Sequence, residues 1–167
     1  MKTDKIYLVG FMAAGKSTLA TRLAERLGWE AQDIDELIEA RERCSVAEIF
    51  VRQGEPYFRI LEREILTLLL PLRRVVVATG GGTYADPDNR RIISLDGVSV
   101  WLDTTFGRVL ERMPLDGRRP LAKDRGQLER LFVLRQEAYQ HADLRLDAHA
   151  VTPDELADQV VGWLETL

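Results

Sequence analysis

Residues 10–17, with the sequence GFMAAGKS, limit the possible folds of this chain more than any other segment. Two glycines separated by four residues precede a lysine and a serine, which is the spacing of a phosphate-binding loop. The spacing has this meaning when the segment follows a strand and opens a helix. A β-prone run at residues 6–9 ends just before it, and helical periodicity extends over residues 16–27. The context favours a strand–loop–helix unit that binds phosphate over a chance glycine turn with an exposed lysine.

The residue types in this loop suit the phosphates of ATP or a close relative. Glycines let the backbone curl so that successive N–H groups point at phosphate oxygens, and the helix N-terminus adds partial positive charge. In such a loop Lys16 reaches the β- and γ-phosphates, and the Ser17 hydroxyl is a ligand of Mg²⁺. The expected nucleotide-binding residues here are Ala13, Ala14, Gly15, Lys16, Ser17 and Thr18.

Apolar runs of strand length alternate with helical patterns along the chain. The expected strands are residues 6–9, 29–34, 75–78, 98–102 and 144–146. Helix starts are expected after Ser45, Asp86 and Thr152, and Pro56 can open a helix that runs to about residue 70. Ser45 and Thr152 each precede a glutamate by three residues, which predicts two capping boxes. The alternation predicts an α/β fold of βαβ units, with a mainly parallel sheet covered by helices on both faces.

Composition limits the class of protein. The 167 residues suit one domain, 1–167, and a net charge of -4 argues against a nucleic-acid-binding surface that relies on bulk positive charge. Cys44 is the only cysteine, so an internal disulfide is impossible, as suits a reducing compartment. No apolar run approaches the roughly 20 residues of a membrane span, and residues 6–9 are too few for a signal peptide. We expect a cytoplasmic monomer with no membrane or nucleic-acid partner.

Two carboxylates, Asp33 and Asp35, follow the second expected strand. In an extended segment, residues i and i+2 face the same side. Both would then face the crevice at the carboxyl end of the sheet, where such folds bind ligands. One can help to hold Mg²⁺ and its waters, and the other can orient a substrate hydroxyl. An acidic helix cap at Asp35 is the alternative.

Two further motifs point to an anionic ligand. Arg59 and Glu62 lie one helical turn apart and can pair, which would make a rigid fork for a carboxylate, although a surface ion pair explains the spacing equally well. Gly80, Gly81 and Gly82 directly follow the third expected strand. Three glycines suggest a close approach of a ligand to the backbone, with a simple turn as the alternative.

Residues 113–126 have no clear periodicity and contain two prolines, two glycines and six charges. They are typical of a mobile surface loop. If this loop closes over a bound nucleotide, Arg118 and Arg119 would supply positive charge to the transferred phosphoryl group. Arg135, on the helix that follows, is a further candidate anion ligand, with a solvated helix residue as the alternative.

These residues together resemble the shikimate kinase family, small P-loop phosphotransferases related to the nucleoside monophosphate kinases. The resemblance covers nearly the whole chain. It rests on GxxxxGKST at residues 10–18, DxD at 33–35, FRxxE at 58–62, ATGGG at 78–82, RPL at 119–121 and RxxxY at 135–139. Two positions depart from the family: Ala13 stands where a glycine is usual, and Glu137 where a proline is common.

The resemblance implies a three-layer P-loop kinase fold, with a central five-stranded parallel sheet, helices on both faces, a mobile lid at about residues 113–126 and substrate-binding helices at about residues 35–62. It also implies the residue roles at the donor site. Lys16 and the loop amides bind the phosphates of ATP. Ser17 is a ligand of Mg²⁺, and Asp33 supports the metal through water. Arg119 is the lid arginine that contacts ATP, with the neighbouring Arg118 as the alternative. Arg112 packs against adenine.

At the acceptor site, the resemblance assigns shikimate as the substrate. Asp35 binds its hydroxyls and is a candidate base. Arg59 and Arg135 bind its carboxylate together with the backbone of Gly80, Gly81 and Gly82, and Phe50 and Phe58 form the walls of the pocket.

The reaction implied is transfer of the γ-phosphoryl group of ATP to the 3-hydroxyl of shikimate, a step of aromatic amino acid biosynthesis. Three alternatives stay open: a kinase for another polyol acid such as gluconate, a nucleoside monophosphate kinase, and a nucleotide-dependent switch without chemistry. The chain lacks the Asn-Lys-x-Asp pattern that recognises guanine, which is evidence against a nucleotide-dependent switch.

Overall fold

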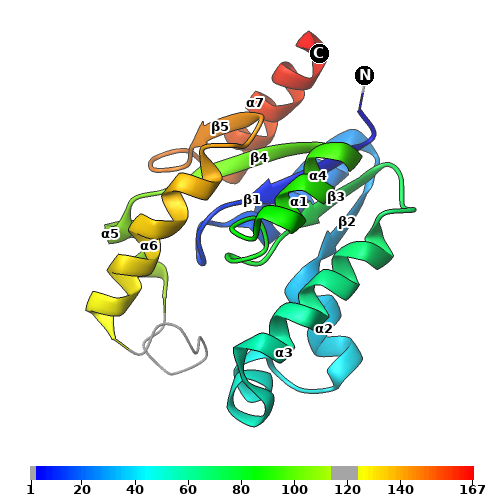
Figure 1. Ribbon diagram of the computed structural model, residues 1–167. Coiled ribbons are helices and arrows are strands. Elements are labelled where there is room, and N and C mark those ends of the chain that lie inside the picture. The colour runs from blue at the N-terminus through cyan, green and yellow to red at the C-terminus, as the bar shows by residue number, and fades with distance from the viewer. Residues whose placement is uncertain (1–2, 114–123) are drawn as a thin grey trace.

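The computed structural model describes residues 3–113 and 124–167, in which strands and helices alternate (Figure 1). The strands are β1 (Lys5–Val9), β2 (Glu30–Asp33), β3 (Val75–Ala78), β4 (Val98–Asp103) and β5 (Leu144–Asp147). The helices are α1 (Lys16–Leu27), α2 (Ile34–Glu42), α3 (Val46–Leu69), α4 (Pro87–Asp96), α5 (Phe106–Arg112), α6 (Arg125–Tyr139) and α7 (Pro153–Thr166).

The strands form one sheet in the order β2-β3-β1-β4-β5, and every neighbouring pair is parallel. Strand β1 lies at the centre, where Ile6 pairs with Val76 on one side and Val98 on the other. The expected five-stranded parallel sheet is therefore confirmed. Because parallel strands end at the same edge, the segments after β1, β2, β3 and β4 meet there.

Alternating side chains of β1 divide the interior into two cores. Tyr7 and Val9 pack with apolar residues of α2 to α6, whereas Ile6 and Leu8 pack with those of α1 and α7. Period-two alternation with both faces buried is what a parallel sheet between two helical layers requires. In Figure 1, α2 and α3 extend past the sheet on the side opposite α5 and α6.

Some boundaries differ from those expected. Strand β2 ends at Asp33, and Ile34 already belongs to α2. Helix α3 unites the two starts expected near Ser45 and at Pro56, and it breaks at Gly54, where φ is 83° and ψ is 170°. Only half of the capping box expected at Ser45 forms: the Ser45 hydroxyl accepts the N–H of Glu48 (3.1 Å). The next N–H along the chain, that of Val46, donates to Glu39 of α2 (3.2 Å).

The expected lid, residues 113–126, falls mainly on residues 114–123, outside the described part of the chain. The last two residues of the expected range, Arg125 and Gly126, lie in α6. Asp124 caps this helix, because its side chain accepts the N–H of Gln127. Over residues 3–113 and 124–167, no helix is long and apolar enough to cross a bilayer.

Candidate active site

The N-terminus of α1 differs from those of the other helices in the described residues. Helices α2 to α7 each begin with a side chain that accepts a backbone N–H; the caps are Asp33, Ser45, Asp86, Thr105, Asp124 and Thr152. Helix α1 begins at Gly15 with no side-chain cap. The helix dipole favours an anion at this uncapped N-terminus.

The loop before α1 is shaped by left-handed backbone. Gly10 and Gly15 have φ of 143° and 98°, and a Cβ on Gly10 would lie 2.8 Å from the Leu102 carbonyl oxygen. Ala13 also has a positive φ, 62°, at the position where the family usually has glycine. Lys16 Nζ donates to the carbonyls of Gly10 (2.7 Å) and Phe11 (2.8 Å), which holds the ammonium against the loop.

A cavity of about 850 Å³ runs from this loop to the glycine turn, residues 80–82, which follows β3. It brings together all the expected site residues that the structure describes. These are Ala13, Ala14, Gly15, Lys16, Ser17, Thr18, Asp33, Asp35, Phe50, Phe58, Arg59, Gly80, Gly81, Gly82, Arg112 and Arg135. Arg118 and Arg119 lie outside the described residues.

Ser17 and Asp33 meet at the junction of loop and sheet. The Ser17 hydroxyl donates to Asp33 Oδ2, while Asp33 Oδ1 accepts the N–H of Glu36 (3.2 Å). Contrary to expectation, Asp33 and Asp35 do not lie on one extended segment. Asp33 caps α2, and Asp35 lies in the first turn of that helix. Both nevertheless face the cavity, because the N-terminus of α2 lies at the carboxyl end of the sheet.

A hydroxyl beside a carboxylate is a donor set that suits Mg²⁺. Within residues 3–113 and 124–167, no three His, Cys, Asp or Glu side chains gather into a metal site. This composition fits a cation that keeps waters and takes other oxygens from bound phosphates. The residues present therefore fit Mg²⁺ bound together with a nucleotide.

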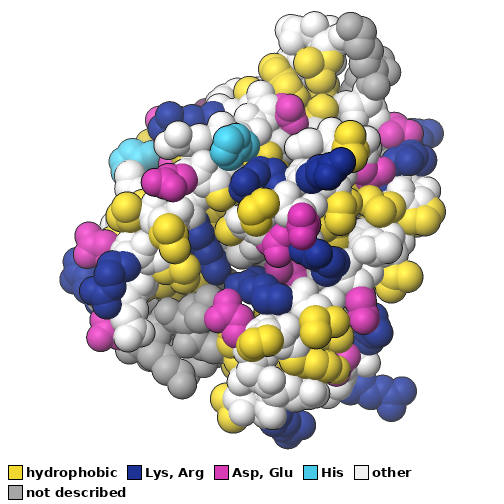
Figure 2. All heavy atoms as spheres, in the orientation of Figure 1, with side chains coloured by type: hydrophobic (Ala, Val, Ile, Leu, Met, Phe, Trp, Pro, Cys, Tyr) yellow, Lys and Arg dark blue, Asp and Glu magenta, His cyan; other side chains and the backbone are white. Residues whose placement is uncertain are grey.

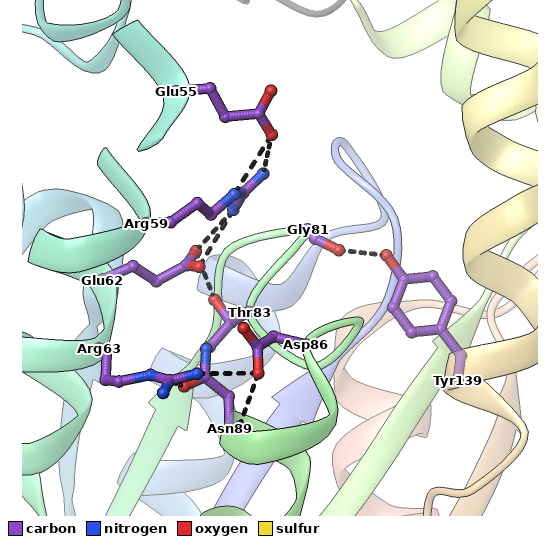
Figure 3. A network of polar contacts seen from close by, with 9 residues as sticks. All are labelled: Glu55, Arg59, Glu62, Arg63, Gly81, Thr83, Asp86, Asn89 and Tyr139. Carbon is purple, nitrogen blue, oxygen red and sulfur yellow. Dashed lines mark hydrogen bonds and ion pairs between the residues drawn. The ribbon is translucent and has the colours of Figure 1, made fainter. Parts of the chain in front are cut away.

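Arg59 is held from two sides on α3. Its Nη1 donates to both oxygens of Glu62 (3.0 and 3.2 Å), and its Nη2 donates to Glu55 (3.1 Å), as Figure 3 shows. Glu62 is completely buried and also accepts the Thr83 hydroxyl (2.8 Å). Burial alone would lower the pKa of Arg59, but Glu62 and Glu55 raise it above its ordinary value. The predicted Arg59–Glu62 pair is thus confirmed as a half-buried, oriented cation.

Arg135 enters the cavity from α6. Only 5% of it is exposed, and its Nη1 has no hydrogen-bond partner among the described residues. Burial lowers the pKa of Arg135. Tyr139 has the next largest effect and opposes this only partly, and the nearby Arg59 cation lowers the pKa further. A buried guanidinium with an unused donor favours an incoming carboxylate, which would compensate its charge.

The glycine turn fills the space between these groups. A Cβ on Gly80 would lie 2.9 Å from Glu62 Oε2 and 3.0 Å from Asp35 Oδ1. One on Gly81 would lie 3.1 Å from Arg135 Nη1, and one on Gly82 would lie 2.5 Å from Arg59 Nη1. None of the three glycines has a positive φ. Close approach to other side chains therefore explains these glycines better than backbone conformation does: Gly81 and Gly82 approach the two arginines, and Gly80 approaches the two carboxylates.

The opposite end of the cavity contains Arg112, which is an expected site residue, and four residues that the sequence did not single out. Arg112, at the end of α5, lies beside the loop with Nη1 3.5 Å from the Ala14 carbonyl oxygen. Ala148, Val151, Pro153 and Leu156 also line this end. These four residues follow β5 at the carboxyl edge of the sheet, where ligands bind in such folds. Their place after the last expected strand could therefore have predicted that they line the site.

Comparison with known proteins decides the family. The shikimate kinase family model matches residues 12–165 of the 167-residue chain. The chain belongs to the shikimate kinase family. A shikimate kinase from Persephonella marina is 41% identical over 158 residues, covering 94% of this chain and 96% of that protein. One from Aquifex aeolicus is 36% identical over 162 residues, covering 96% of each.

Solved structures agree with this assignment. Shikimate kinase from Acinetobacter baumannii, in complex with shikimate, superposes with a TM-score of 0.94 at 32% identity, covering 99% of this chain and 94% of that one. Thymidylate kinase from Candida albicans superposes with a TM-score of 0.59 at 15% identity, which shows a shared fold alone. The three-layer P-loop kinase fold expected from the sequence is confirmed.

Proposed function

We propose that this shikimate kinase family member transfers the γ-phosphoryl group of ATP to the 3-hydroxyl of shikimate, a step of aromatic amino acid biosynthesis. One observation carries the proposal. A single cavity joins the uncapped N-terminus of α1 to a glycine turn flanked by two arginines. The first end suits polyphosphate, and the second suits a small carboxylate.

At the donor end, the loop amides and Lys16 bind the β- and γ-phosphates. The ammonium leaves the carbonyls of Gly10 and Phe11, which it contacts at 2.7 and 2.8 Å, for oxygens of higher charge. The base of ATP lies between Arg112 and the apolar residues Val151 and Pro153, which line that end. Arg119 remains a sequence-based prediction for the lid.

Ser17 and Asp33 would hold Mg²⁺ at the same end, Ser17 directly and Asp33 through water. When bound there, the cation would neutralise part of the charge on the transferred phosphoryl group. The contact between the Ser17 hydroxyl and Asp33 supports this assignment, because it places the two oxygens side by side.

At the acceptor end, Arg59 and Arg135 bind the carboxylate of shikimate. The Glu62 carboxylate orients Arg59, while Arg135 offers its unused Nη1 donor. Asp35 accepts a hydrogen bond from the reacting hydroxyl and aligns it with the γ-phosphorus. The charge of the phosphoryl transition state is spread over three oxygens, so positioning and positive charge provide most of the catalysis.

A few properties of the whole protein belong to the proposal. We propose that the protein works as a monomer. We propose that the protein acts in the cytoplasm, because a chain with a single cysteine forms no internal disulfide and suits a reducing compartment. On the face drawn in Figure 2, Lys and Arg side chains are interspersed with Asp and Glu side chains and form no large positively charged patch. The net charge of the chain is -4. Both features support a small-molecule partner rather than nucleic acid.

An acceptor panel tests the function. The protein is assayed with ATP, Mg²⁺ and either shikimate, gluconate or AMP, and ADP formation is followed with coupling enzymes. We expect turnover with shikimate and none above background with the other two. Turnover on gluconate or AMP without turnover on shikimate would refute the proposal, and so would ATP binding with no transfer to any of them.

A further inference from the structure

Tyr139 is a buried tyrosine at the end of α6, one helical turn after Arg135. Its side chain is fully buried, its ring lies 5.9 Å from that of Trp101, and its hydroxyl donates to the Gly81 carbonyl (Figure 3). Burial raises the pKa of Tyr139 above its ordinary value, and the positive charge of Arg135 opposes this only partly. The hydroxyl therefore remains a hydrogen-bond donor throughout the neutral range.

The peptide unit at Gly81 is held from several directions. A Cβ there would lie 3.1 Å from Arg135 Nη1 and 3.2 Å from the Met12 backbone nitrogen, so the backbone packs directly against both. Tyr139 holds the carbonyl. Helix α6 therefore fixes the position of Gly81 relative to Arg135 with two residues spaced four apart, which share one face of the helix.

The other end of the glycine turn is held by α3. The Thr83 N–H donates to the Gly80 carbonyl (3.1 Å), and the Thr83 hydroxyl donates to Glu62 (2.8 Å), which orients Arg59. The turn thus lies between two supports, one from each helix that supplies an arginine. Tyr139 is the support on the α6 side.

We infer that Tyr139 is a positioning residue for the acceptor: its hydroxyl sets the orientation of the Gly81 peptide beside Arg135 and so sets the affinity for the acceptor carboxylate without touching it. This inference rests on the proposed function for the identity of the acceptor. Removal of the hydroxyl frees the Gly81 carbonyl to rotate, while the bonds from Lys16 to the carbonyls of Gly10 and Phe11 do not involve Tyr139. The effect should be confined to the acceptor.

Substitution Tyr139→Phe removes the hydroxyl and keeps the ring. The matched control is Tyr7→Phe, which removes the hydroxyl of an equally buried core tyrosine. That hydroxyl donates to Asp96 (2.5 Å), and Tyr7 does not line the cavity. We expect the KM for shikimate to rise about three- to ten-fold in Tyr139→Phe, which is the fold-change that the loss of one hydrogen bond produces. The KM for ATP and kcat should stay within two-fold of their wild-type values. In Tyr7→Phe, both KM values should stay at wild type even where the melting temperature falls.

Amide hydrogen exchange of the ligand-free proteins gives a second measurement that needs no acceptor. The amides of residues 80–83 should exchange faster in Tyr139→Phe than in wild type or Tyr7→Phe. Unchanged exchange at these amides would overturn the inference, as would equal rises in the two KM values. If wild type fails to phosphorylate shikimate, the proposed function falls, and the exchange comparison alone decides the role of Tyr139.

Discussion

At the scale of single residues, the chemistry depends on cations held in place by carboxylates and glycines. Arg59 shows how much of this the sequence could predict. Its pairing with Glu62 follows from helical spacing, but its contact with Gly82 joins residues on different elements and does not follow from any local pattern. Local spacing fixes contacts within one helix, whereas contacts between elements depend on packing of the whole chain.

The first prediction concerns Arg59. In Arg59→Ala the fork for the carboxylate is lost, so affinity for shikimate should fall about 100-fold, as for a charge-assisted pair, while ATP affinity stays within two-fold. Titration calorimetry with each ligand measures both values. An equal fall in the two affinities would show that Arg59 does not belong to the acceptor site.

The second prediction concerns Gly82. A Cβ there would overlap the guanidinium of Arg59, which is the flexible end of a side chain, so the arginine should give way while the backbone stays. Gly82→Ala should raise the KM for shikimate about ten-fold with little change in melting temperature. Gly107→Ala is the control, because its Cβ would meet nothing closer than 3.9 Å. A wild-type KM in Gly82→Ala would contradict the close packing of turn and arginine.

At the scale of elements, strand and helix positions were largely predictable, and the errors have local causes. The strand expected over residues 29–34 ended early because Asp33 caps α2. The capping box at Thr152 formed in full with Glu155. At Ser45 only the bond from the Glu48 N–H to the serine hydroxyl formed, and the Val46 N–H donates to Glu39 of α2. Capping signals are read from neighbouring residues, so a contact from another helix does not follow from them.

The third prediction concerns the break in α3. The φ and ψ of Gly54, 83° and 170°, lie in a region that is almost exclusive to glycine. Gly54→Ala should destabilise the protein by about 1–3 kcal/mol, a fall of several degrees in melting temperature. Gly162→Ala, in the interior of α7 with open space at its Cβ, should instead stabilise it by about 0.5–1 kcal/mol. Equal effects of the two substitutions would contradict this difference in backbone conformation.

At the scale of the whole molecule, a buried ionic cluster ties β1 to α3 and α4. Lys5 is completely buried; its ammonium contacts Asp96 Oδ2 at 2.7 Å and donates to the Leu69 carbonyl at 2.5 Å. Tyr7 and Arg73 also donate to Asp96. Neither the sequence motifs nor the periodicity predicted this cluster, since a lysine inside a strand pattern gives no sign of its partner.

The fourth prediction follows from Asp96. Burial raises its pKa, but the hydrogen bonds from Lys5, Tyr7 and Arg73 outweigh burial, and the net pKa is lowered. A lowered pKa in the folded state means that the stabilisation is complete above the unfolded value, about 3.9, and is lost as pH falls through the folded value. The free energy of unfolding should therefore decrease below about pH 4.

Asp96→Asn isolates this contribution. It should cost about 3 kcal/mol at pH 7, because Lys5 keeps a buried charge without its carboxylate partner, and it should flatten the acid dependence. Urea unfolding between pH 3 and 7 measures both effects. A variant with the same pH dependence as wild type would show that other carboxylates govern acid stability.

If one cavity aligns the γ-phosphoryl group of ATP with the 3-hydroxyl of shikimate, the phosphate must appear on that oxygen alone. Phosphorus NMR of the product measures this, because coupling to the ring protons identifies the oxygen that carries the phosphate. With ATP, Mg²⁺ and shikimate, we expect one phosphomonoester, on the 3-hydroxyl, formed in step with ADP. Free phosphate as the main product, or a phosphomonoester on another oxygen, would show that the cavity does not align these two groups.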